Sequence, residues 1–87
     1  MEWSDEANEI NEALLRELPA PVRSLVHEST QQRAESLTSE AGEDEVSMET
    51  AVQAFVESTP ADLRQRLKHL LTYHGIDPEE YAAAFSS

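Results

Sequence analysis

Apolar residues recur at helical spacing from the start of the chain. Ser4 precedes this pattern as an N-cap residue, and Asp5 and Glu6 follow it in the first turn, where the helix dipole favours anions. The pattern continues to Leu18, before Pro19. It predicts a first helix with a single apolar face. The residues of that face step by four, three, four and four positions: Trp3, Ala7, Ile10, Leu14 and Leu18.

A second, longer helix is predicted from Pro21 to about Ala41. Proline suits the first helical position, because its missing N–H group would have no partner there. The apolar pattern is weaker here: Thr30 interrupts it, and residues 29–33 make the centre of the helix polar. The expected apolar face, with Leu25 beside it, consists of Val22, Val26, Ala34, Leu37 and Ala41.

The third helix should follow an acidic loop of residues 42–45. Gly42 stands where the second helical pattern stops, as a left-handed C-terminal cap requires. Val46-Ser47 then reads as a hydrophobic residue before an N-cap. The third helix has a dense apolar face made by Met48, Ala51, Val52, Phe55 and Val56.

Two further helices are predicted after residue 58. Thr59-Pro60-Ala61-Asp62 has a cap residue, a first-position proline and a third-position acid, and Gly75 should end that helix. Asp77-Pro78 repeats the start signal for a short fifth helix. The inward residues expected for these two helices are Leu63, Leu67, Leu70, Leu71, Tyr81, Ala82 and Phe85.

The fold class predicted from these elements is all-α. A chain of 87 residues can bury only one small core, which leaves no room for a deep active site between domains. We therefore expect residues 1–87 to form a single domain, a bundle of about four to five helices.

Composition narrows the classes of function. With 18 acidic and 6 basic residues the formal net charge is -12, so direct binding to nucleic acid is disfavoured. The chain has no cysteine, which removes disulfides, cysteine-ligated metal sites and thiol catalysis. No apolar run suggests a secretory signal or a membrane span, and we expect a cytoplasmic location.

Several short motifs occur together in the first two-thirds of the chain. They are Trp3-Ser4-x-Glu6-Ala7, Leu18-Pro19-x-x-Val22-Arg23, a helix ending at Gly42, and Glu45-Val46-Ser47-x-Glu49 followed by Ala54. In this order they resemble the small C-terminal helical domain of the B subunit of light-independent protochlorophyllide reductase, a domain that also occurs in stand-alone proteins. The similarity covers residues 3–57, and residues 58–87 form additional C-terminal helices. The resemblance implies a structural role for four of the matching residues: Trp3, Pro19, Val22 and Gly42.

The resemblance implies a helical accessory module in chlorophyll or bacteriochlorophyll biosynthesis. It does not imply catalysis by this chain, because the family reaction uses a cysteine-held iron–sulfur cluster and this chain has no cysteine. The family's second helix is usually rich in lysine and arginine. In this chain Arg33 alone keeps that charge among His27, Glu28, Gln31, Gln32 and Glu35.

Basic residues gather in one predicted helix. Residues 59–75 carry a net charge of +2, whereas the chain as a whole is acidic. Arg64 and Lys68 should lie away from the leucine face, where they either pair with acids of neighbouring helices or form a docking face. Together with Arg23, at the turn between the first two helices, they make the candidate interaction surface.

Aromatic and histidine residues have structural and functional interpretations. Trp3, Tyr73, Tyr81 and Phe85 should pack in the core where the chain ends meet it, or else form an aromatic patch for a partner or pigment. His69 and His74 are five positions apart, hence on different helix faces, and His27 belongs to another helix. This spacing favours structural or solvent-exposed histidines over metal or tetrapyrrole ligands, and no metal or cofactor is expected.

These observations favour a non-catalytic protein-interaction or regulatory module. The resemblance links it to the dark reduction of protochlorophyllide or to photosynthetic assembly, with a protein as its partner. One alternative is an acidic decoy that occupies the basic groove of a nucleic-acid-binding protein. Another is a tetrapyrrole carrier that uses a histidine. Neither the partner nor the oligomeric state follows from the sequence.

Overall fold

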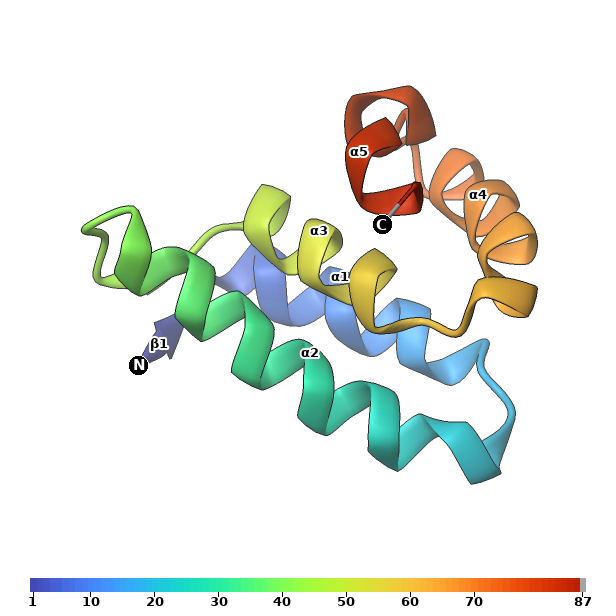
Figure 1. Ribbon diagram of the computed structural model, residues 1–87, viewed down its shortest axis with the longest axis horizontal. Helices are drawn as coiled ribbons and strands as arrows, with labels where there is room; N and C mark the ends of the chain where they lie inside the picture. The colour runs from blue at the N-terminus through green and yellow to red at the C-terminus, as the bar shows by residue number, and fades with distance from the viewer. Residues whose placement is uncertain (87) are drawn as a thin grey trace.

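α-Helices make up most of the chain in the computed structural model, which describes residues 1–86 (Figure 1). The prediction of an all-α bundle is confirmed. Two short strands and two 3₁₀ turns join the five α-helices of the described residues. In chain order the elements are β1 (Glu2–Trp3), α1 (Asp5–Arg16), α2 (Ala20–Glu40), β2 (Glu45–Val46), α3 (Met48–Ser58), η1 (Ala61–Leu63), α4 (Arg64–Tyr73), η2 (Pro78–Tyr81) and α5 (Ala82–Phe85).

Helix α3 is the centre of the packing. α1 and α2 form an antiparallel pair, and each contacts α3 more extensively than it contacts the other (Figure 1). The same helix also packs against α5. α3 therefore joins the N-terminal helical pair to the C-terminal helices.

Helix starts follow the predicted caps at two serines. The Ser4 hydroxyl oxygen accepts a hydrogen bond from the Ala7 N–H at 3.0 Å, and the Ser47 hydroxyl oxygen accepts one from the Thr50 N–H at 3.2 Å. Each bond satisfies a backbone donor that has no partner within its helix. The starts of α1 and α3 are therefore fixed by local sequence.

Helix ends follow the two glycines. Gly42 and Gly75 have φ angles of 73° and 79°, in the left-handed region that glycine adopts without a Cβ clash. Beyond them, the Glu43 N–H donates to the Thr38 carbonyl at 3.0 Å and the Ile76 N–H donates to the Leu71 carbonyl at 2.8 Å. These bonds reverse the chain after α2 and α4 and confirm both predicted stops.

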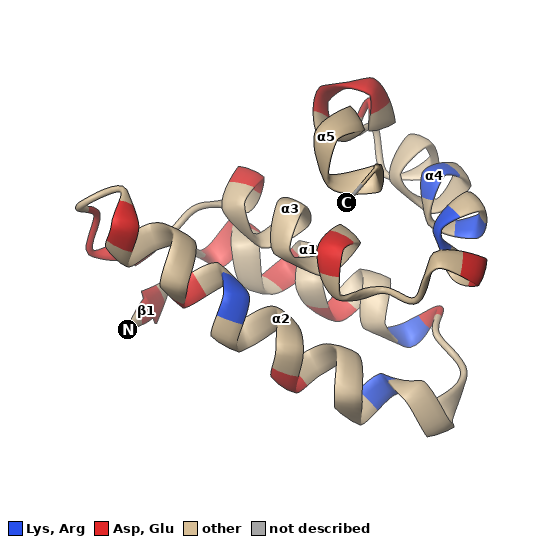
Figure 2. Cartoon of the chain, viewed as in Figure 1, with Lys and Arg blue, Asp and Glu red and all other residues tan. Residues whose placement is uncertain are grey.

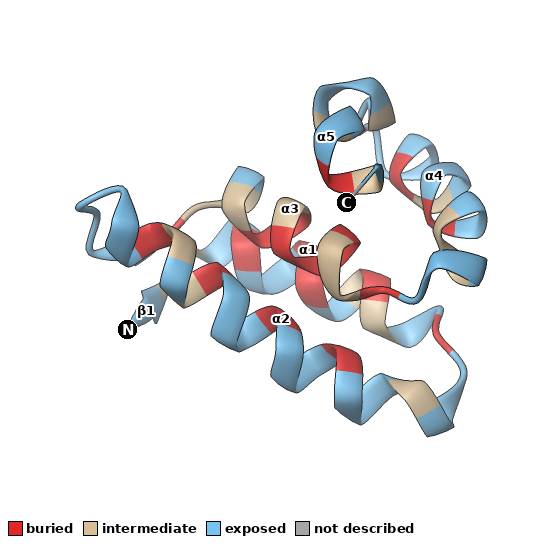
Figure 3. Ribbon diagram, viewed as in Figure 1, coloured by how far each residue is buried: buried red, intermediate tan, exposed pale blue. Residues whose placement is uncertain are grey.

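The core combines one face from each long helix with most of α3 (Figure 3). Burial of such side chains is the main favourable contribution to folding, roughly 2 kcal/mol for each large one. Trp3, Tyr81 and Phe85 pack against this core and are half-buried. Its largest fully buried side chains are Phe55, Leu14, Leu67, Leu71, Val46, Val52 and Val56.

The buried face of α2 differs from the predicted one. Its buried residues are Val26, Thr30, Ala34 and Thr38, at steps of four, so Thr30 continues the buried face and does not interrupt it. Leu25, expected beside this face, is 70% exposed. Spacing decided the burial, because small threonine side chains fit between closely packed helices.

Other corrections concern the ends of elements. α1 ends at Arg16, two residues earlier than predicted, although Leu18 is buried. Thr59 does not cap the next helix: its hydroxyl donates to the Phe55 carbonyl at 2.7 Å, and the chain passes through η1 before α4 begins. Tyr73 is 83% exposed, so its predicted core position is wrong.

A parallel strand pair was not expected in an all-α chain. β1 pairs with β2 in a register that sets Glu2 opposite Glu45 and Trp3 opposite Val46. The Ser4 N–H also donates to the Val46 carbonyl at 3.0 Å. The start of the chain is thereby fixed beside the loop that leads into α3, and this pairing places the Trp3 indole.

Candidate functional site

Arg23 lies at the joint between α1 and α2. Its Nε donates to the Leu15 carbonyl at 3.0 Å, and its Nη2 donates to the Leu18 carbonyl at 2.9 Å and to the Arg16 carbonyl at 3.5 Å. These carbonyls lie at the end of α1, where the helix leaves acceptors without partners. The structure thus gives Arg23 a structural role, and its role in docking stays a prediction.

Arg64 and Lys68 lie together at the C-terminal end of the chain. Arg64 donates from Nε to the Thr59 carbonyl at 3.0 Å and from Nη2 to the Glu57 carbonyl at 3.3 Å, and from Nη1 to the Phe85 carbonyl at 3.3 Å. The Lys68 ammonium lies 5.3 Å from the centre of the Phe85 ring, within cation–π range. Both side chains connect α4 to neighbouring elements. Arg23 instead contacts the end of α1, so among the described residues it has no contacting residue in common with Arg64 and Lys68.

The four positions of the family resemblance lie in strand β1, at turns or in the first turn of α2. Trp3 is half-buried, and its Nε1 donates to Oε2 of Glu35 on α2 at 3.3 Å. Pro19 precedes the first residue of α2, Val22 packs against the core, and Gly42 adopts the left-handed conformation. Each position has a structural reason for its residue type.

Acidic and basic residues are distributed unevenly over the chain (Figure 2). Acidic residues occur on α1, in the loop between α2 and α3 and around η2, whereas α4 carries three basic residues. Arg33 on α2 forms an ion pair with Glu57 on α3 at 2.9 Å. The acidic surface around α1 is therefore the surface that would attract a positively charged partner.

One hollow of about 410 Å³ lies on the acidic side of α1. We call it the acidic groove. Ile10 and Ile76 are buried in its floor, and Met48 is half-buried. Glu6 and Glu9 are exposed at its rim. Its lining comes from α1, the start of α3 and the end of α4: Glu6, Glu9, Ile10, Ala13, Met48, His74, Gly75 and Ile76.

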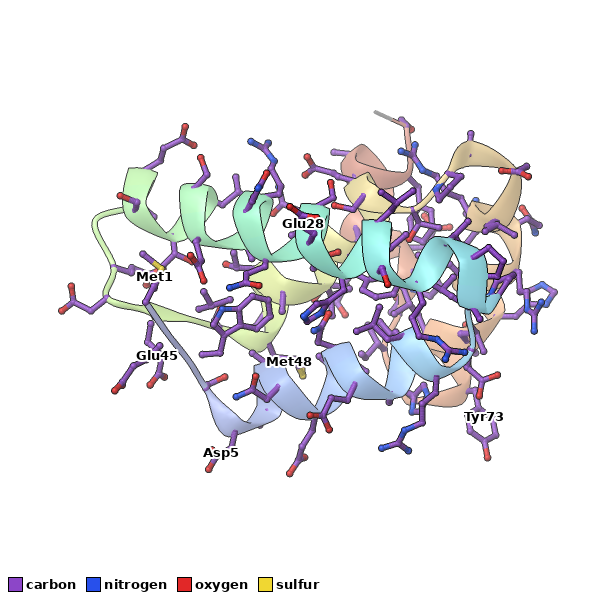
Figure 4. The ribbon with its side chains drawn as sticks, turned by 90° about the horizontal axis from the view of Figure 1, so that it is seen from below. Met1, Asp5, Glu28, Glu45, Met48 and Tyr73 are labelled. Carbon is purple, nitrogen blue, oxygen red and sulfur yellow. The ribbon has the colours of Figure 1, made fainter. Side chains whose placement is uncertain are left out.

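A second hollow, of about 200 Å³, lies on the opposite face of α1, toward α2. We call it the polar cavity. Figure 4 views the α1–α2 pair from the side that α3 does not cover. The lining contains one indole, one imidazole and three carboxamides: Trp3, His27, Asn8, Asn11 and Gln31.

Two buried polar groups have no hydrogen-bond partner among the described residues. They are the Asn11 carboxamide oxygen and the Thr30 hydroxyl. Asn11 is only 7% exposed and Thr30 is fully buried. Other buried threonines differ, since the Thr38 hydroxyl donates to the Ala34 carbonyl at 2.8 Å. A buried polar group without a partner costs about 1–3 kcal/mol.

Asn11 was not predicted from the sequence as a functional residue. The signal was present, because Asn11 follows Ala7 by four positions and precedes Leu14 by three, which is the spacing of the buried face. A polar residue at such a position is informative, since buried polar groups normally have partners.

The histidines do not form a metal-binding cluster. Within residues 1–86, no group of three or more histidine and acidic side chains is placed to hold a metal ion. His27 lines the polar cavity and His74 lines the acidic groove. His69 is exposed on α4, so the three histidines lie in separate surroundings.

The Tyr81 side chain, at the end of η2, is half-buried. Burial raises the pKa of its phenol above the usual value of 10.0, and the nearby Glu49 and Glu80 carboxylates raise it further. The phenol is consequently neutral over the physiological range. Its role is packing against the core.

Comparison with known proteins adds no relative: no family model, curated protein or solved structure matches this chain. The resemblance to the reductase domain is carried by the motifs of the sequence and stays a prediction. In the part of the chain that the structure describes, no helix is long and apolar enough to span a bilayer.

Proposed function

We propose that this chain is a non-catalytic, cytoplasmic protein-interaction module that binds a basic amphipathic segment of a partner protein in the acidic groove. The observation that carries the proposal is an apolar floor bordered by carboxylates, in a chain with a net charge of -12. Such a surface offers burial for an apolar anchor and attraction for the cations beside it.

The groove selects its partner by chemistry. Ile10, Met48 and Ile76 provide apolar contact, and Glu6 and Glu9 are one helical turn apart on α1. A helix with apolar residues at three- and four-residue spacing, flanked by lysine or arginine, matches both features. A volume of about 410 Å³ accommodates one or two anchoring side chains.

The resemblance over residues 3–57 supports a place for this module in chlorophyll or bacteriochlorophyll biosynthesis. There it would act beside a light-independent reductase or a related photosynthetic assembly. Because this chain has no cysteine, an iron–sulfur cluster would be held by the partner. The module would contribute binding, with the chemistry carried out elsewhere.

Calorimetric titration with a synthetic amphipathic peptide of leucine and lysine tests the groove. The double variant Glu6→Gln/Glu9→Gln should weaken binding by roughly fivefold, because two rim carboxylates are neutralised. The matched control is Glu43→Gln/Asp44→Asn, which changes the net charge equally at an exposed loop away from the groove. The control should bind as tightly as the unchanged chain.

Two outcomes contradict this assignment. If the peptide does not bind, the groove is not a docking site. If both double variants lose affinity equally, attraction is set by total charge, and the acidic decoy of a basic groove becomes the better explanation.

The pathway is tested separately with the purified B subunit of a light-independent protochlorophyllide reductase. We expect the B subunit to bind this chain directly, and we expect the leucine–lysine peptide to displace it. If the B subunit does not bind, the proposed link to this pathway is wrong. The assignment of the groove would then depend on the peptide experiment alone.

A further inference from the structure

We propose that the polar cavity between α1 and α2 is a binding site for a small neutral nitrogen heterocycle of the adenine type. This site lies on the face of α1 opposite the acidic groove and shares no lining residue with it. The two sites can therefore be occupied and tested separately.

The Asn11 carboxamide is the first reason. It is more than nine-tenths buried, it lines the cavity, and its oxygen has no hydrogen-bond partner among residues 1–86. The oxygen itself is buried, so it reaches a ligand only when the amide turns about its last torsion, and this rotation is easy for asparagine. A molecule in the cavity that both donates and accepts would then give the turned amide a partner.

The composition of the lining is the second reason. Asn8, Asn11 and Gln31 present three carboxamides, and a carboxamide pairs with the amino group and ring nitrogen of adenine through two hydrogen bonds. Trp3 adds an indole and His27 adds an imidazole, which offer flat surfaces for stacking. The Trp3 N–H is already donated to Glu35, so the indole contributes its face.

Charge and size exclude larger ligands. The lining contains no lysine or arginine, and its Trp3 indole donates to the Glu35 carboxylate. A phosphate would therefore find no cation and would be repelled by the acidic protein. At about 200 Å³ the cavity is smaller than the usual drug-sized pocket, which suits a free base.

The experiment is a nitrogen-15 NMR titration of the whole chain with adenine. We expect shifts at the backbone and side-chain amides of the cavity lining, with saturation. The variant Asn11→Leu should weaken binding by at least about tenfold, because the carboxamide is lost at nearly constant volume. Gln31→Ala, at an exposed lining position, should weaken it severalfold.

Thr30→Val is the matched control, since it removes the other unpartnered polar group without touching the cavity lining. Its adenine affinity should equal that of the unchanged chain. Adenosine monophosphate should bind more weakly than adenine because of its phosphate.

The proposal is overturned if adenine causes no saturable shift at the lining residues, or if Asn11→Leu binds adenine as well as the unchanged chain. Stronger binding of choline than of adenine would also overturn it, because the indole would then serve a cation and the carboxamides would be incidental.

Discussion

The two sides of the α1–α2 pair are built differently. On the side covered by α3, the contacting residues are apolar and fully buried, with Leu14, Ala34 and Phe55 as examples. On the opposite side, α1 and α2 make few contacts with each other, and the space between them is lined by carboxamides and aromatic rings (Figure 4).

This difference separates stability from binding capacity. The covered side contributes apolar burial, the main favourable contribution to folding. The uncovered side retains the Asn11 carboxamide, whose oxygen has no hydrogen-bond partner among the described residues; this lowers the stability and leaves a polar group at the cavity for a ligand. Because α3 holds α1 and α2 together, these two helices do not need extensive contacts with each other, and a hollow can remain between them.

The largest effect should come from breaking the covered side with Phe55→Ala. Removing a buried phenylalanine side chain costs about 3–5 kcal/mol. For a folded chain of 87 residues we expect a total unfolding free energy of about 4–13 kcal/mol. Urea unfolding followed by circular dichroism should show a much lower midpoint.

The control for this variant is Leu25→Ala, which truncates a side chain that is 70% exposed. Its unfolding free energy should change by less than about 0.5 kcal/mol. A comparable loss in both variants would mean that α3 is not the centre of the packing.

An intermediate effect is expected at the joint of the pair. Arg23→Met removes hydrogen bonds to the Leu15 and Leu18 carbonyls and should reduce the unfolding free energy by about 1–2 kcal/mol. Arg66→Met removes an exposed cation from α4 and should cost less than about 0.5 kcal/mol. Equal effects of the two variants in thermal unfolding would show that the carbonyl contacts of Arg23 contribute nothing.

The smallest effect should be a gain at the buried face of α2. Thr30→Val removes an unpartnered buried hydroxyl at constant shape and should raise the unfolding free energy by about 1 kcal/mol. Thr38→Val removes a hydroxyl that donates to the Ala34 carbonyl and should lower it. A loss in both variants would contradict the assignment of Thr30 as unsatisfied.

Local sequence signals predicted most of the fold. Ser4 and Ser47 cap helices through bonds to the residue three positions on, and Gly42 and Gly75 end helices through their own backbone conformation. Such features depend on a few neighbouring residues, so they are visible without the tertiary structure.

Features that depend on distant segments were missed. The β1–β2 pairing joins residues more than forty positions apart, and its two-residue strands have no periodicity of their own. Burial of Asn11 and Thr30 depends on which helix covers which face, which composition does not reveal. The roles of Arg23 and Arg64 could not be predicted either, because they depend on where the carbonyl groups at helix ends lie in the folded chain.

The β1–β2 pairing has a consequence for motion. Trp3, a wall of the polar cavity, is held by a strand of two residues, whereas the other walls belong to helices. Short terminal segments open more readily than a helical core, and they do so without global unfolding. The cavity therefore has one wall that can open by local fraying, and slower hydrogen exchange at the Ser4 amide would report its closure over a ligand.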